Sequence, residues 1–223
     1  MRVFIVYCHP SEDSFTKNMC DAFIKGVTDS GNEYIISDLY KMGCDRIIYQ
    51  GERIMAEEFL TLMADLDDDS QQTLSVWYEE LKKAGFSGVQ TPGLPFHISM
   101  GSFSLDKEAD VIEEMKVLAA RFSAIPVHIS HIGLFAGGKV LYAAPDMNPA
   151  DLLNLRHAIQ TETQEIFPWT PHCTIIIDEA ETIQKALPIL ARHFQPFMGR
   201  ITKLHLCAFW PTREIATVFL END

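Results

Sequence analysis

The stretch Pro95-Phe96-His97-Ile98-Ser99 and its counterpart Pro171-His172-Cys173-Thr174 decide the fold of this chain. Each places a histidine two residues before a hydroxyl residue, within a run that favours a strand. Residues i and i+2 of a strand point to the same face, so each motif presents an imidazole and a hydroxyl side by side. Ile98 and Cys173 face the other way. Two copies in similar surroundings indicate a site built from two equivalent halves.

The pattern around the two motifs recurs in the order strand, helix, hairpin, which indicates an internal duplication. The first copy turns its hairpin at Gly137-Gly138 and the second at Pro211-Thr212-Arg213. A further helix precedes the second copy. The predicted elements are a strand at 95–103, a helix at 106–122, a hairpin at 127–144, a helix at 148–165, a strand at 172–178, a helix at 179–194 and a hairpin at 201–220.

The N-terminal residues have a different pattern. Residues 2–7 predict a buried strand, residues 15–30 a helix that Gly31 ends, and residues 33–37 a second strand parallel to the first. We therefore expect the chain to have three parts: a βαβ fragment at 1–45, a linker at 46–54 and a larger domain at 55–223. The larger domain begins with a strand at 59–65, a solvated acidic loop at 67–69 and a helix at 71–84.

Composition limits the cellular setting and the partners. The chain has 223 residues, a net charge of −13 and five scattered cysteines, which fits a cytoplasmic protein with reduced thiols. No apolar run is long enough to cross a membrane, and no signal peptide is evident. The negative charge disfavours long DNA, but it leaves room for a small phosphate-bearing ligand.

Two imidazoles and two hydroxyls suit phosphoester chemistry that needs neither a metal nor a cofactor. His97 and His172 form the expected acid–base pair, since imidazole titrates near neutral pH. Ser99 and Thr174 would donate to the phosphate oxygens. The order in which the two histidines act stays open, and two ordinary strand histidines are the alternative.

Other candidates for the cleft are weaker. His131 and His205 match each other when the repeats are aligned, and half-buried sheet histidines are the alternative for both. Lys139 and Arg213 also match, and they would either neutralise phosphate or remain solvated next to their turns. The triplet His128-Ile129-Ser130 has the same His-x-Ser pattern as the first motif. It has no histidine partner in the repeat, so we expect a structural role.

Residues 55–223 resemble the two-histidine phosphoesterase superfamily, also called 2′-5′ RNA ligase-like, through His97-Ile98-Ser99 and His172-Cys173-Thr174. The resemblance implies an α+β fold of duplicated, bilobal type, with antiparallel sheets lining a central cleft. It also implies a metal-independent hydrolase, such as a cyclic nucleotide phosphodiesterase or an RNA-processing enzyme. The implied substrates are small nucleotides or RNA ends with a 2′,3′-cyclic or 2′-5′ phosphodiester.

Residues 1–45 resemble the start of the flavodoxin-like NAD(P)H:quinone oxidoreductases, through the run 3–10, Ser14-Phe15 and residues 37–42. In that family the loop matching His9, Ser14 and Phe15 holds the flavin pyrophosphate at a helix N-terminus. A flavin-dependent quinone reductase is therefore one alternative function, and a non-catalytic nucleotide-binding module is another. The truncated sheet would keep an open edge, and we expect either the larger domain or another protomer to cover it, so a homo-oligomer formed through this fragment is one alternative.

Overall fold

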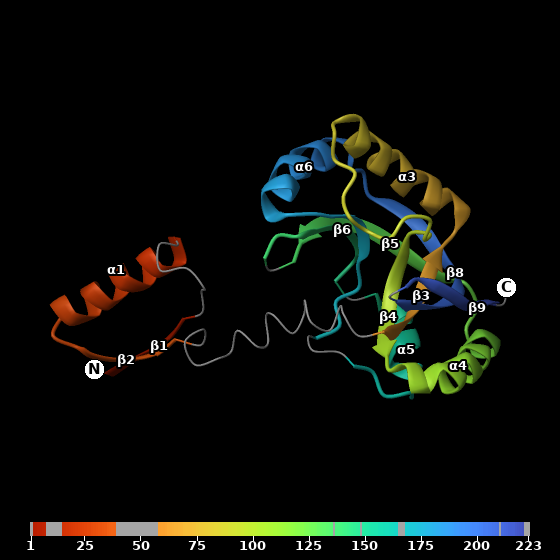
Figure 1. The fold of residues 1–223 in the computed structure, drawn as a ribbon, viewed down its shortest axis with the longest axis horizontal. Helices are drawn as coiled ribbons and strands as arrows, with labels where there is room; N and C mark the ends of the chain where they lie inside the picture. Colours follow the sequence, from red (N-terminus) through yellow and green to blue (C-terminus); the bar gives the residue numbers. More distant parts are fainter. Residues whose placement is uncertain are drawn as a thin grey trace. The chain divides into compact units, whose positions relative to one another are not determined.

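The computed structural model describes residues 2–7, 15–38, 58–135, 137–147, 149–164, 168–209 and 211–220. The chain divides into two compact units, Met1–Glu57 and Glu58–Asp223 (Figure 1). Within the described ranges, each helix is too short or too polar to cross a bilayer.

The first unit is a βαβ element, as the sequence predicts. It contains β1 (Arg2–Tyr7), α1 (Phe15–Asp29) and β2 (Glu33–Asp38), and the two strands pair in parallel. Gly31 follows the helix with a φ of 68°, the left-handed conformation that glycine adopts without strain. His9, Ser14 and the linker at 46–54 lie outside the described residues.

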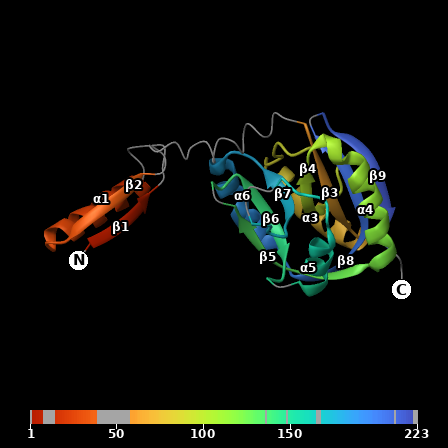
Figure 2. The ribbon, with the colours of Figure 1, turned by 90° about the horizontal axis from the view of Figure 1, so that it is seen from below.

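The second unit is built on antiparallel strands that close into a ring. Their order is β3-β4-β7-β6-β5-β8-β9, and β3 also pairs with β8. Helices α3 and α6 lie together at one end of the unit, and α4 and α5 lie at the other (Figures 1 and 2). The elements are β3 (Phe59–Leu66), α3 (Asp68–Lys83), β4 (His97–Phe103), η2 (Leu105–Lys107), α4 (Glu108–Arg121), β5 (Ile125–Leu134), β6 (Val140–Pro145), α5 (Ala150–Ala158), β7 (Cys173–Ile177), α6 (Ala180–His193), β8 (Phe197–Phe209) and β9 (Arg213–Phe219).

The strand β8 pairs with three other strands. Its first residues pair with β5, and its remaining length lies between β3 and β9. On the opposite side of the ring, β4 and β7 share a single described pair, Ile98 with Cys173. The ring is therefore a single seven-stranded sheet, in which the runs β4-β3-β8-β9 and β7-β6-β5-β8 share the strand β8. The predicted duplication is confirmed, since strand, helix and hairpin occur as β4-α4-β5-β6 and again as β7-α6-β8-β9.

Alternation along β3 separates the hydrophobic core from the face that carries the motifs. Leu60, Leu62 and Ala64 are fully buried in the large core that the helices cover. Their neighbours Met63 and Asp65 point to the opposite face, because successive side chains in a strand alternate. Asp65 pairs across the strands with His97, so this second face is the one on which the first motif lies.

The predicted helix at 148–165 is too long. The helix α5 ends at Ala158, and the backbone amides of Gln160 and Thr161 donate to the carboxylate of Glu114 on α4. The amide of Gln164 donates to the carbonyl of Ser102 on β4, at 2.7 Å. Tertiary partners thus replace the hydrogen bonds that a longer helix would make.

The acidic run at 67–69 is not a loop. Asp67 caps α3 by accepting from the amide of Ser70 at 2.8 Å, and Asp68 and Asp69 form the first turn of the helix. A carboxylate stabilises a helix N-terminus, because it satisfies free amides there and complements the helix dipole. The helix therefore begins three residues before the predicted start.

Candidate active site

The two histidine motifs lie on neighbouring strands. The antiparallel pair of Ile98 with Cys173 joins β4 to β7, and both side chains are fully buried in the core. Antiparallel geometry then sets His97 opposite Thr174 and Ser99 opposite His172, all on the other face. The structure thus brings the four predicted residues of the motifs together.

Both imidazoles are oriented in the same way. Nδ1 of His97 lies 2.8 Å from the carbonyl oxygen of Pro95, and Nδ1 of His172 lies 2.7 Å from that of Thr170. A carbonyl only accepts, so Nδ1 carries the hydrogen and donates in each case. The lone pair of the neutral ring is therefore on Nε2. The two repeats present two Nε2 atoms that can accept or carry a proton.

Burial lowers the pKa of both histidines below 6.5, and the carbonyls of Pro95 and Thr170 oppose this shift. Positive charge on His97 lowers the pKa of His172 further, so the two rings lie within electrostatic reach of each other. Close spacing of two imidazoles thus disfavours the doubly protonated state.

Two aromatic rings flank His172. The ring of Phe135 meets it edge to face with centroids 4.6 Å apart, and the centroid of Tyr142 is at 5.5 Å. Tyr142 occupies this position because it packs over Gly133, where an added Cβ would lie 2.5 Å from the tyrosine ring. The sequence pattern did not single out Phe135, because it is one apolar residue before a turn.

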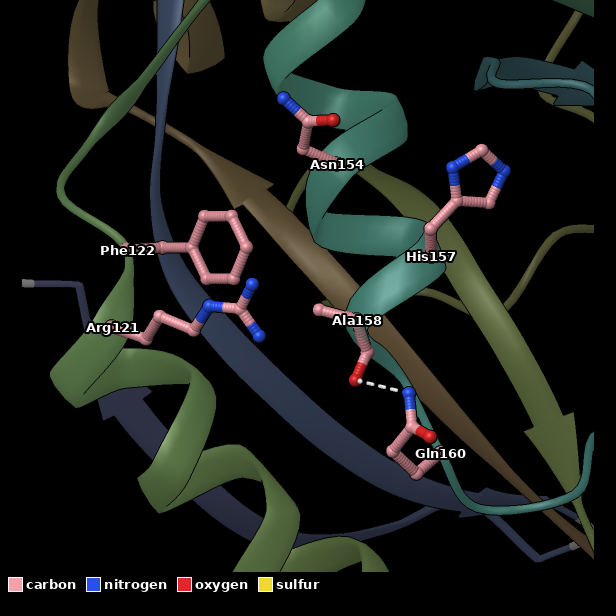
Figure 3. Close-up of a pocket in the computed structure, with 6 residues that line it drawn as sticks. All are labelled: Arg121, Phe122, Asn154, His157, Ala158 and Gln160. Carbon is pink, nitrogen blue, oxygen red and sulfur yellow. Dashed lines mark hydrogen bonds between the residues drawn. The ribbon is translucent and has the colours of Figure 1, made fainter.

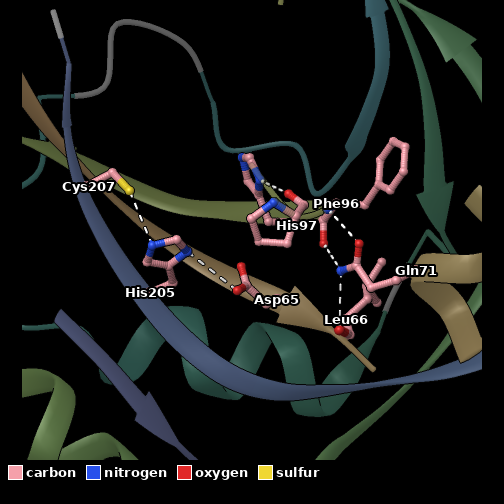
Figure 4. A network of polar contacts seen from close by, with 8 residues as sticks. Asp65, Leu66, Gln71, Phe96, His97, His205 and Cys207 are labelled. Carbon is pink, nitrogen blue, oxygen red and sulfur yellow. Dashed lines mark hydrogen bonds and ion pairs between the residues drawn. The ribbon is translucent and has the colours of Figure 1, made fainter. Parts of the chain in front are cut away.

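His97 has a polar neighbourhood instead. Asp65 and His205 are both buried, and Nδ1 of His205 lies 3.4 Å from Oδ2 of Asp65 (Figure 4). Nε2 of His205 lies 3.3 Å from Sγ of Cys207. The predicted cleft residue His205 thus lies near the first motif. Asp65 was missed, although a lone carboxylate in the apolar strand at 59–65 is a visible signal.

A cavity of about 450 Å³ opens beside these groups. Its lining is mostly polar, and it reaches the segment that precedes His97. The residues that line it are Asp65, Gly93, Leu94, Pro95, Lys203, His205, Glu214 and Thr217.

Side chains from outside the motifs hold both segments in place. The amide of Gln71 on α3 donates to the carbonyl of Phe96 at 2.7 Å and accepts from its backbone N–H at 2.8 Å (Figure 4). Nε1 of Trp169 donates to the carbonyl of Ser99 at 2.7 Å, which ties the approach to the second motif onto β4. The position of each histidine is thus fixed by a neighbouring element.

The other predicted cleft residues have different surroundings. His131 is exposed on β5, and its Nδ1 lies 3.2 Å from the hydroxyl of Ser130. Lys139 and Arg213 are exposed and form ion pairs at 3.3 Å with Glu179 and at 2.7 Å with Glu108.

The triplet at 128–130 does not resemble the motifs structurally. Nδ1 of His128 lies 3.1 Å from a carboxylate oxygen of Asp146, rather than against a carbonyl two residues upstream. The imidazole of His128 is half-exposed, and the acid that it pairs with is exposed.

A second hollow, of about 480 Å³, lies between the end of α4 and α5 (Figure 3). It contains none of the motif residues. Its lining is Arg121, Phe122, Asn154, His157, Ala158 and Gln160. In the part of the chain that the structure describes, no three His, Cys, Asp or Glu side chains are grouped to hold a metal ion.

Comparison with known proteins places these features in context. Residues 68–209 match the family model of the 2′-5′ RNA ligase superfamily. A crystal structure described as a phosphoesterase superposes with a TM-score of 0.51 at 17% identity, covering 74% of this chain and 100% of its own. E. coli LigT complexed with 3′-AMP superposes with a TM-score of 0.51 at 18% identity, covering 74% of this chain and 99% of LigT. None of the curated proteins matches the sequence.

These matches bear on the two resemblances seen in the sequence. The family model covers both histidine motifs, and the fold is the mixed helix and antiparallel-sheet arrangement of LigT. The flavodoxin-like resemblance of the N-terminal fragment is not supported, since the family match begins at residue 68.

Proposed function

Because this chain belongs to the 2′-5′ RNA ligase superfamily, we propose that it is a metal-independent phosphoesterase acting on a 2′,3′-cyclic or 2′-5′ phosphodiester of a nucleotide or an RNA end. The observation that carries the proposal is the antiparallel pair of Ile98 with Cys173. This pair sets two imidazoles and two hydroxyls on one face, with both Nδ1 atoms bound to carbonyls. Such a set matches the needs of in-line displacement at phosphorus.

The proposed reaction uses one imidazole as base and the other as acid. A neutral Nε2 removes a proton from a water molecule as its oxygen bonds to phosphorus. The bond from phosphorus to the leaving oxygen breaks, and the imidazolium of the second histidine donates its proton to that oxygen. Ser99 and Thr174 donate hydrogen bonds to the non-bridging oxygens, where negative charge grows. Acid–base assistance of this kind contributes about 10²–10⁴-fold to the rate.

A small nucleotide is the substrate that the surroundings favour. The rings of Phe135 and Tyr142 beside His172 offer an apolar surface on which a nucleobase can stack. The net charge of −13 disfavours long nucleic acids. The LigT relative was crystallised with 3′-AMP, a ligand of the same chemical class.

Hydrolysis of 2′,3′-cyclic nucleotides in the presence of a chelator tests the proposal. We expect turnover with a bell-shaped dependence of kcat/KM on pH, since one imidazole must be neutral and the other charged. Turnover that vanishes with chelator would instead indicate a metallohydrolase. Saturable nucleotide binding without any product over long incubation would favour the non-catalytic binding module.

A further inference from the structure

The two histidines of the site differ in their charged neighbours. Burial lowers the pKa of His97, and the carboxylate of Asp65, its cross-strand partner on β3, opposes that shift together with the Pro95 carbonyl. Among the described residues, no carboxylate contributes to the pKa shift at His172, which follows from burial, the Thr170 carbonyl and the charge on His97. The site is therefore symmetric in its backbone and asymmetric in its electrostatics.

Asp65 is held by a chain of polar groups that ends at a thiol. Burial raises the pKa of Cys207 to about 11, so its sulfur keeps a hydrogen at neutral pH. That S–H can donate to Nε2 of His205, 3.3 Å away. Nδ1 faces Oδ2 of Asp65 at 3.4 Å (Figure 4). His205 thus orients the carboxylate of Asp65.

The second oxygen of Asp65 is the most informative atom of this group. Oδ1 is buried, and it has no hydrogen-bond partner among the residues that the structure describes. Leaving a buried carboxylate oxygen unpaired costs stability, so a purely structural role would favour a second donor. A charge on a buried carboxylate acts strongly on neighbouring groups, because little water screens it.

The remaining charged groups near His97 do not cancel this effect. Lys203 on β8 and Glu214 on β9 both line the adjoining cavity, and their charges have opposite signs. Charge on His205 would lower the pKa of His97, and His205 lies between the Cys207 thiol and the carboxylate of Asp65. His172 is the other titratable neighbour. The carboxylate of Asp65 is thus the group that distinguishes His97 from His172.

We propose that Asp65, oriented by His205, keeps the proton of the site on His97 and makes His97 the general acid and His172 the general base. The assignment rests on the proposed function. His172 Nε2 takes the proton of the attacking water, and His97 Nε2–H gives its proton to the leaving oxygen. Exchange with solvent then returns both rings to their starting states. Asp65 and His205 are positioning residues in this scheme, since they act through His97.

The test is a titration of the imidazoles by NMR, which needs no substrate. Signals are assigned with His97→Gln and His172→Gln. In the native protein we expect His97 to have the higher pKa of the two. In Asp65→Asn we expect the pKa of His97 to fall by about one unit or more, as for the loss of a nearby opposite charge. The pKa of His172 should not fall with it.

The matched control is Asp146→Asn, which removes a carboxylate from His128 on the hairpin outside the motifs. This substitution should leave the pKa values of His97 and His172 unchanged. In active protein, Asp65→Asn should also move the basic limb of kcat/KM to lower pH by the same amount, because that limb reports loss of the acid's proton.

Two results would overturn the assignment of acid and base but leave the proposed function standing. One is a higher pKa at His172 than at His97 in the native protein, which needs no variant to fold. The other is an unchanged pKa of His97 in folded Asp65→Asn. A native protein without any phosphodiesterase activity would instead overturn the proposed function, and the assignment with it.

Discussion

Ile98 and Cys173 are paired across β4 and β7, and this pair joins the two repeats where their histidine motifs begin. Both side chains are completely buried, so the backbone at this position is anchored from the core side. The neighbouring residues of each strand consequently face the site. One buried backbone pair therefore sets the geometry on which the proposed chemistry depends.

The roles of the paired histidines can be separated from those of a similar triplet. We expect His97→Ala and His172→Ala each to lower kcat/KM by about 10²–10⁴-fold, since each removes one proton-transfer step. His128→Ala is the matched control, because His128 begins a His-x-Ser triplet outside the motifs and pairs with Asp146. Initial rates on 2′,3′-cyclic nucleotides measure all three. Equal losses in the control would contradict the assignment of the site.

Gly133 is expected to position Tyr142 beside His172. In Gly133→Ala the new Cβ would lie 2.5 Å from the ring of Tyr142, so the ring must move. Overpacking of this kind costs about 1–3 kcal/mol, and KM for a nucleotide should rise. A double-mutant cycle with Tyr142→Ala checks the cause, since Gly133→Ala should then cost little. Additive effects of the two changes would show that they do not interact.

Stability should fall in mildly acidic solution. The pKa values of His97 and His172 are lowered by folding, so the unfolded chain binds protons near pH 6.5 that the folded protein does not. The contribution of these two histidines to the free energy of unfolding is then fully present above about pH 6.5. It falls as the pH drops toward their pKa values in the folded protein. Thermal melts at pH 7.5 and 5.5 measure the change. The double variant with glutamine at both positions should show a weaker dependence on pH.

The cap of α3 should contribute measurably to stability. Asp67→Ala removes the side chain that accepts from the amide of Ser70, and we expect a loss of about 1 kcal/mol. Asp69→Ala, in the first turn of the same helix, tests the dipole contribution alone and should cost less. Urea unfolding of the two variants gives the comparison. A larger loss for Asp69→Ala would be inconsistent with capping by Asp67.

Sequence periodicity identified the repeated order of elements, because apolar residues recur at the spacing of strands and helices on both copies. It failed at the end of α5, where Glu114 supplies hydrogen-bond acceptors from a different helix. A contact of that kind has no local signature. The start of α3 was missed for another reason, since Asp67 was interpreted as part of a loop rather than as a cap.

The site was predictable to the extent that its residues alternate along a strand. Two His-x-Ser/Thr motifs were sufficient to bring His97, Ser99, His172 and Thr174 to one face. Asp65 reaches His97 only through strand pairing between β3 and β4, which the sequence does not specify. Phe135 contacts His172 from the end of the hairpin, and its neighbours in sequence do not indicate this.

The shared strand β8 has a consequence for how the larger unit unfolds. Because β8 pairs with β5 along its first residues and with β3 and β9 along the rest, loss of its hydrogen bonds leaves open edges in both repeats. We therefore expect the two repeats to unfold together, with a single midpoint. Neither repeat can be excised as an independent half, since each would lose the strand that completes its sheet.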